Sequence, residues 1–103
     1  MYAKATQLQF QPGTTEEATR IIRDIMIPSA STQQGFKGAF MLRPDTEPDK
    51  HIIISLWETK AHLLASHPPE EIIPLLAPLD AYIIDCVQDT CDTLLSLYNN
   101  QSQ

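Results

Sequence analysis

The chain has 103 residues, of which 43% are hydrophobic and 19% charged, so it can form one globular core and is too apolar for a disordered protein. Its formal net charge of −6 disfavours nucleic acid and anionic membrane surfaces as partners. The longest apolar run is too short to span a bilayer, and the N-terminal residues do not resemble a secretory signal. We therefore expect one cytoplasmic domain over residues 1–103, with 92–103 as a C-terminal extension that frays at 99–103.

The N-terminal third predicts a strand followed by an amphipathic helix. Polar and apolar residues alternate from Tyr2 to Phe10, as in a half-buried strand. Thr14 precedes Glu17 by three residues, the spacing of a capping box at a helix start. Apolar residues then recur at helical spacing: Ala18, Ile21, Ile22, Ile25 and Met26. Pro28 is expected to kink or end this helix, and residues 29–34 lead out of it.

The middle of the chain predicts a β-hairpin. The segment 35–38 permits a tight entry into a strand from Ala39 to Arg43, which ends at the turn-rich residues 44–49. The next strand, His51 to Trp57, is the most hydrophobic in the chain. One of its faces carries Ile52, Ile54 and Leu56, and the other carries His51, Ile53, Ser55 and Trp57. We expect both faces to be largely buried.

The C-terminal third predicts short helices and a last strand. Thr59 is a suitable N-cap for a helix through Ser66, and Pro68-Pro69 precede a short helical piece over residues 70–76. Alternation from Ala81 to Asp89 predicts a fourth strand. Residues 92–98 fit either a helix or a short strand exchanged with a partner chain.

The predicted order is β-α-β-β-α-β, the α+β arrangement called ferredoxin-like or split βαβ. In it a four-stranded antiparallel sheet carries both helices on one face. The third strand is apolar on both faces, so an apolar face remains uncovered by the chain's own helices. We expect a homodimer formed through this open sheet face.

Two short segments resemble the antibiotic biosynthesis monooxygenase family. They are Gln34-Gly35-Phe36-Lys37-Gly38 and, after a hairpin, Trp57-Glu58-Thr59-Lys60 before a helix, although Gln34 replaces the proline usual in that family. The order and length of the elements agree over about residues 2 to 90. The resemblance implies a dimeric α/β barrel with a small cavity in each protomer. It also implies an activity such as cofactor-independent oxygenation of phenols, quinol oxidation or haem degradation, although many members have no demonstrated activity.

Cofactor-independent oxygenation requires an apolar slot with a few polar groups and a base. The catalytic candidates are Trp57, which can stack on an aromatic substrate, Tyr82, which can bond a substrate oxygen, and His51, a base placed at the edge of an exposed loop. The remaining residues of the substrate pocket are expected to be Thr6, Ser55, Ile53 and Phe40. Core packing is the more common role of a large aromatic residue such as Trp57, and a tyrosine at a strand start, such as Tyr82, is commonly a half-buried wall. We expect a small apolar or aromatic ligand.

No cofactor or metal site is expected. No nucleotide-binding, zinc or serine-hydrolase motif occurs, and Cys86 and Cys91 lack the spacing of a redox or metal site. The positions that match the haem-degrading residues of the family are Thr6, Ser66 and Leu76, which disfavours haem degradation; haem binding through His67 stays open. The sequence therefore indicates a possible monooxygenase or quinol oxidase, with a non-catalytic dimeric or stress-related binding module as the alternative.

Overall fold

The computed structural model describes residues 1–97, so the expected frayed end at 99–103 and Tyr98 lie outside the described part. The elements are β1 (Tyr2–Phe10), α1 (Thr15–Ile21), η1 (Ile22–Met26), α2 (Ile27–Ala30), β2 (Phe36–Leu42), β3 (Lys50–Trp57), α3 (Lys60–Ala65), η2 (Glu70–Ile72), α4 (Ile73–Leu76), α5 (Pro78–Tyr82) and β4 (Ile83–Asp92). Within this part, no helix is both long and apolar enough to cross a membrane.

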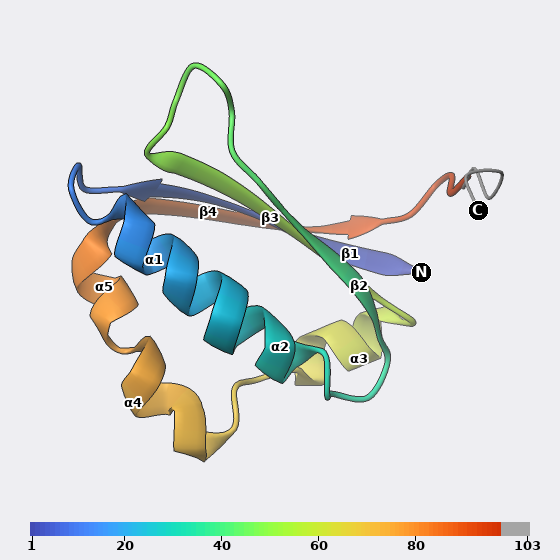
Figure 1. Cartoon of the computed structure of the whole chain (residues 1–103). Helices are drawn as coiled ribbons and strands as arrows, with labels where there is room; N and C mark the ends of the chain where they lie inside the picture. Colours follow the sequence, from blue (N-terminus) through green and yellow to red (C-terminus); the bar gives the residue numbers. More distant parts are fainter. Residues whose placement is uncertain (98–103) are drawn as a thin grey trace, which may run out of the picture.

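The four strands form one antiparallel sheet in the order β2-β3-β1-β4. The helices of the described residues lie on one face of this sheet, as Figure 1 shows, which confirms the predicted ferredoxin-like α+β fold. Even-numbered residues of β1 face the helices. Leu8 and Phe10 therefore join a single core, whose other members include Ile53 of β3, Ile21 of α1, Ile22 of η1 and Leu79 of α5.

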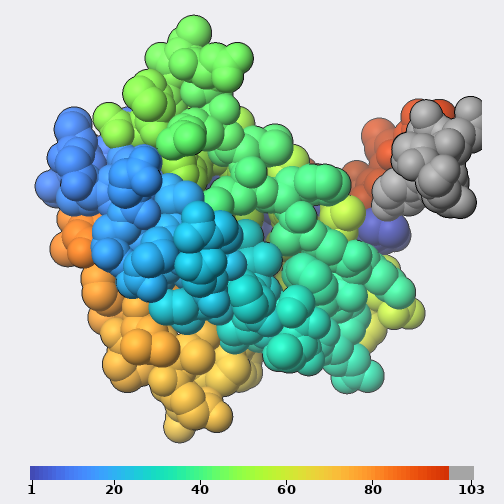
Figure 2. Space-filling model, in the orientation of Figure 1, coloured from blue at the N-terminus to red at the C-terminus, as the bar shows by residue number. Residues whose placement is uncertain are grey.

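One continuous helical rod, formed by α1, η1 and α2, covers the middle of the sheet. Figure 2 shows it, from blue to teal, between the β2–β3 hairpin and the orange α4–α5 segment. Thr14 is the N-cap residue, but the predicted capping box is absent, because the Thr14 hydroxyl donates to the Gln11 carbonyl at 2.7 Å. That bond closes the preceding turn instead of capping the helix.

The helix also runs two residues beyond Pro28 before it ends at Ala30. Residues 22–26 form a π-turn, in which the Ile27 N–H donates to the Ile22 carbonyl, five residues earlier. Such a turn is wider than an α-turn, so the proline ring avoids the carbonyl that it would meet in a regular α-helix. The widened turn explains why Pro28 does not stop the helix at once.

The fourth strand begins later and ends later than predicted. Residues 78–82 form a helix with Pro78 at its first position, so Ala81 and Tyr82 are helical and β4 spans Ile83–Asp92. The Thr93 N–H extends the pairing with β1 by donating to the Met1 carbonyl at 3.0 Å. Residues 93–97 form no helix, and Leu94, Leu95 and Leu97 are almost fully exposed.

Candidate functional site

A cavity of about 300 Å³ lies between the sheet and the helical rod. Its floor is the helix-facing side of β1, β3 and β4, and Ile22, Met26 and Ile27 form much of its roof. A cavity of this size is at the lower end of the range of small-molecule sites in proteins. It is therefore the candidate functional site.

Strand register makes part of the cavity floor polar. Thr6 pairs with Ile53 on one side and Gln88 on the other, and Lys4 pairs with Ser55 and Thr90. Directly paired residues of an antiparallel sheet point to the same face, here the face that the helices cover. The floor thus changes from the apolar core around Leu8 to a strip of hydroxyl, amide and ammonium groups.

Trp57 forms the wall at the end of β3. Only 3% of its surface is exposed, and its ring packs edge-to-face on Phe36 with centroids 5.4 Å apart. The indole N–H donates to Ser55 Oγ at 3.0 Å. The Ser55 hydroxyl is therefore an acceptor toward Trp57, and its own proton stays available to another group.

Two features of the opposite wall bear on ligand binding. Ser29 lines the cavity, and its hydroxyl is buried without a hydrogen-bond partner in the structure. An unpaired buried hydroxyl lowers the stability of the fold by about 1–3 kcal/mol, and a bound ligand or water could supply the missing hydrogen bond. The Gln33 amide, near the end of the rod, bonds both the N–H and the carbonyl of His67, at 3.1 and 2.5 Å. This double contact holds His67 at the cavity wall.

The structure brings together four of the residues that the sequence assigned to the pocket. They are Thr6, Ile53, Ser55 and Trp57. Phe40 was wrongly assigned: it pairs with Ile54 on the other face of the sheet and is 54% exposed. Tyr82 is not among the lining residues, because its place at the end of α5 packs it against the core.

His51 is buried, which corrects the expectation that it is exposed at the edge of a loop. It is 2% exposed, with Nδ1 2.8 Å from the Lys50 carbonyl oxygen and Nε2 2.7 Å from Thr19 Oγ1. It shares the face of Ile53 and Trp57, but it lies under α1 and does not line the cavity. The strand alternation already contained the signal that it faces inward.

Sequence reasoning missed several cavity residues, among them Lys4, Ser29, Gln88 and Cys86. Lys4 has the same parity as Thr6 on β1, so the alternation that selected Thr6 also selects Lys4. The others depend on the length of the helical rod and on the β1–β4 register, which no local pattern reveals. Within residues 1–97, no three metal-ligating side chains cluster in a way that would hold a metal ion.

The haem-degrading positions also find no support in the structure. Thr6 and Ser66 line the cavity, but Leu76 does not. His67 lines the cavity, with its Nδ1 3.2 Å from the Pro68 carbonyl oxygen. The residues present do not fit a haem-degrading site.

Solved structures with the same fold include SnoaB, a cofactor-independent oxygenase from Streptomyces nogalater. It has a TM-score of 0.76 and 15% identity over 95% of this chain and 97% of that one. A protein of Chloroflexus aurantiacus named for antibiotic biosynthesis monooxygenase also has a TM-score of 0.76 and 15% identity, over 94% and 96% of the two chains. A Nitrosomonas europaea protein with the same family name has a TM-score of 0.79 and 12% identity, over 92% of this chain and 100% of that one.

None of the curated proteins matches the chain. The likeness to solved structures concerns the fold, since the identities are low. Residues 1–70, however, match the family described as antibiotic biosynthesis monooxygenase. Because that match covers more than half of the sequence, the chain belongs to the antibiotic biosynthesis monooxygenase family.

Proposed function

We propose that the protein is a cofactor-independent monooxygenase or quinol oxidase that acts on a small aromatic compound. The observation that carries this proposal is the cavity of about 300 Å³ behind Trp57, which combines apolar walls with the polar strip of Thr6, Ser55 and Lys4. Apolar walls exclude water from a reactive carbanion, and polar groups orient the substrate oxygen. Family membership and the fold shared with SnoaB support the same activity.

In such a reaction the substrate supplies the electrons and the protein removes a proton. A quinol would lose two electrons and two protons to O₂, giving a quinone and hydrogen peroxide. A phenolic ring with an activated methylene would become a ketone, with the second oxygen atom leaving as water. The protein must therefore bind the ring, accept a proton and keep water away.

We assign the role of base to His67. Its Nδ1 faces the Pro68 carbonyl oxygen, which can only accept, so Nδ1 carries hydrogen and Nε2 is free to take a proton. His67 is one of the residues that line the cavity, and Gln33 fixes its backbone. Trp57 remains the surface on which an aromatic substrate would stack.

Oxygen uptake tests this proposal. Wild-type protein should accelerate oxygen consumption with at least one member of a panel of naphthohydroquinones and hydroxyanthrones, and His67→Gln should lower that rate at least about 100-fold. Tyr82→Phe is the matched control, because Tyr82 does not line the cavity. Oxygen uptake no faster with wild-type protein than without protein would overturn the enzyme proposal, and equal acceleration by wild-type protein and His67→Gln would overturn the assignment of His67 as the base.

A binding module without catalysis is the second candidate. It is favoured by the position of His51, since the one fully buried imidazole lies beneath α1 and outside the cavity lining. This leaves the exposed His67 as the imidazole that reaches the cavity. An apolar compound that copurifies with the protein and is not turned over under oxygen would support this candidate.

We also propose that the working form is a cytoplasmic homodimer joined through the open sheet face. Phe40, Leu42 and Val87 of that face are about half exposed, and the leucines at 94, 95 and 97 add further exposed apolar surface. Exposed apolar surface on both edge strands of one sheet face is typical of an interface. The exposed unpaired thiols Cys86 and Cys91 suit a reducing compartment.

A further inference from the structure

The charge of the cavity is opposite to that of the protein. The sequence has 13 acidic and 7 basic side chains, yet no aspartate or glutamate is among the described residues that line the cavity. The lining does include Lys4 and His67. Within residues 1–97, the lining of this cavity is therefore free of carboxylates, although the protein is acidic, and an ammonium group lies on its floor.

That ammonium group has no carboxylate partner in the described structure. None of the four ion pairs found within residues 1–97 involves Lys4. Lys4 is partly buried by its place between Ser55 and Thr90 on the covered face of the sheet. A lysine in such a position is available as the counter-charge of a bound group.

The neighbour of Lys4 offers a second donor. Ser55 Oγ accepts the indole proton of Trp57 at 3.0 Å, so the Ser55 hydroxyl proton can be donated toward the cavity. Lysine can only donate. The Lys4–Ser55 pair therefore presents donors to the ligand, a chemistry that selects an oxyanion.

We propose that the cavity binds a flat apolar ligand through one oxyanion, a carboxylate or an ionised phenol, held by Lys4 and Ser55. This inference rests on the proposed function only in taking the cavity as the ligand site. The apolar body lies against Trp57 and the Ile22–Ile27 roof. An oxyanion that enters this cavity loses favourable hydration free energy. Lys4 offsets that loss with an opposite charge, and Ser55 offsets it with a hydrogen bond.

Calorimetric titration with two probes of nearly the same shape tests the oxyanion site. Naphthalene-2-carboxylate should bind the wild-type protein at least about tenfold more tightly than naphthalene-2-carboxamide, as a charge-assisted hydrogen bond predicts. Lys4→Met should remove this preference and leave carboxamide binding within about threefold, whereas Lys4→Arg, which keeps the charge, should retain most of it. The control is Lys60→Met, since Lys60 lies over the Tyr2 ring outside the cavity lining.

Equal affinity of wild-type protein for the two probes would overturn the inference, as would binding of neither at millimolar concentration. Equal weakening of both probes by Lys4→Met, in protein whose melting temperature is unchanged, would also overturn it. Titration with 2-naphthol separates the two oxyanions: binding that tightens as the naphthol ionises supports a phenolate ligand, and pH-independent binding leaves the carboxylate. Oxygen uptake plays no part in these titrations, so a carboxylate preference without turnover would defeat the oxygenase proposal alone.

Discussion

The imidazole of His51 ties strand β3 to helix α1 inside the core. Its Nε2 lies 2.7 Å from Thr19 Oγ1, while Nδ1 is satisfied by the Lys50 carbonyl. Thr19→Val would leave Nε2 buried without a partner. We expect a loss of about 1–3 kcal/mol in the free energy of unfolding, measured by urea denaturation. Thr46→Val, in an exposed loop, is the control, and a Thr19→Val variant as stable as this control would refute the role of the contact.

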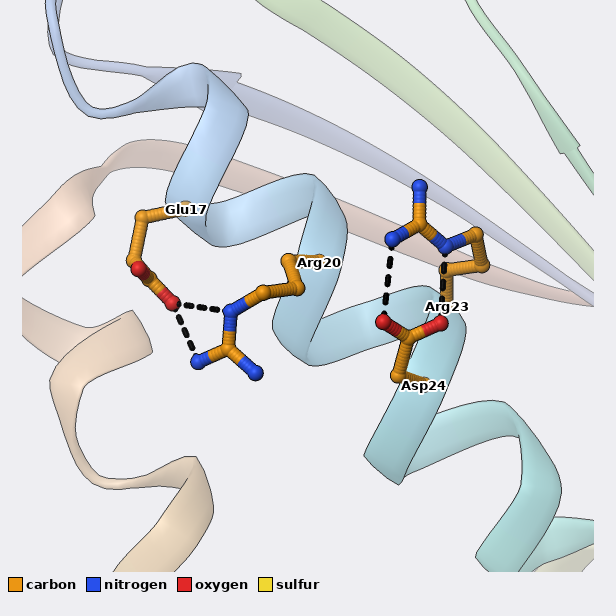
Figure 3. A network of polar contacts seen from close by, with 4 residues as sticks. All are labelled: Glu17, Arg20, Arg23 and Asp24. Carbon is orange, nitrogen blue, oxygen red and sulfur yellow. Dashed lines mark hydrogen bonds and ion pairs between the residues drawn. The ribbon is translucent and has the colours of Figure 1, made fainter.

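The Asp24 carboxylate pairs with the neighbouring Arg23 on the solvent side of the helical rod. Arg23 Nε and Nη2 donate to the two carboxylate oxygens at 2.7 and 2.9 Å. Figure 3 shows this pair beside the separate Glu17–Arg20 pair. The hydrogen bond from Arg23 lowers the pKa of Asp24 below its usual value. The contact therefore stabilises the fold at pH values above the range of an unfolded aspartate, and this contribution disappears as the pH falls through the lowered pKa.

Arg23→Gln should raise the pKa of Asp24 toward that usual value, as followed by NMR titration of the carboxyl group. Arg43→Gln, on a distant loop, should leave the Asp24 curve unchanged. The effect on stability should be small, since both side chains are exposed and solvent screens the pair. Identical Asp24 curves in wild-type protein and Arg23→Gln would show that the pair does not persist in solution.

Among the secondary-structure elements, the turn into β2 depends on Gly35. This residue has φ +84°, its carbonyl accepts the Glu58 N–H at 2.7 Å, and a Cβ there would overlap the ring of His62. Gly35→Ala should therefore destabilise the protein more than Gly13→Ala, which has φ +89° but open space and should cost about 1–2 kcal/mol. Thermal and urea unfolding of both variants, of His62→Gly and of Gly35→Ala with His62→Gly, separate backbone strain from the clash, because the overlap involves the Cβ of His62 as well as its ring. Equal costs of the two alanines would contradict the overlap.

The periodicity of apolar residues in the sequence was sufficient to predict the main strands and helices. It was insufficient where the backbone hydrogen bonds change from one helix type to another or from helix to strand. β1 and the N-cap at Thr59 are as predicted, because alternation and local capping chemistry determine them. The prolines were harder to interpret. Pro28 lies within a helix whose π-turn accommodates it, and Pro78 begins a helix that removes Tyr82 from the strand. A proline is compatible with a helix start or a widened turn as well as with a break, and local sequence does not distinguish these cases.

At the scale of the whole molecule, the open sheet face predicts a dimer. Phe40→Asp would place a charge in the proposed interface, where burial without a partner is costly, and should shift the protein to a monomer. Size-exclusion chromatography with light scattering at micromolar concentration measures this change. Leu64→Asp is the control, because Leu64 is at least as exposed as Phe40 and lies on α3, on the side of the helices. A wild-type monomer under these conditions would refute the interface.

The cavity was only partly predictable, because it depends on contacts between distant segments. Thr6, Ser55 and Trp57 were predicted correctly from their side-chain chemistry and the family resemblance, and strand parity places all three on the helix-facing side of the sheet. Phe40 was misplaced because β2 changes register between Phe36 and Gly38, and a hairpin loop of this length does not fix which residues pair. Gln88 and Ser29 required the β1–β4 register and the full length of the helical rod. These are long-range properties that no short motif encodes.

The position of Trp57 has an optical consequence. It is the single tryptophan of the sequence, it is buried, and it forms a wall of the cavity. Its fluorescence therefore arises from one known place, with the indole N–H bonded to Ser55 and the ring against Phe36. A compound that does not itself absorb at the emission wavelength, and that enters the cavity, should change the emission colour or yield without any attached label. The native protein thus contains its own spectroscopic reporter of cavity occupancy.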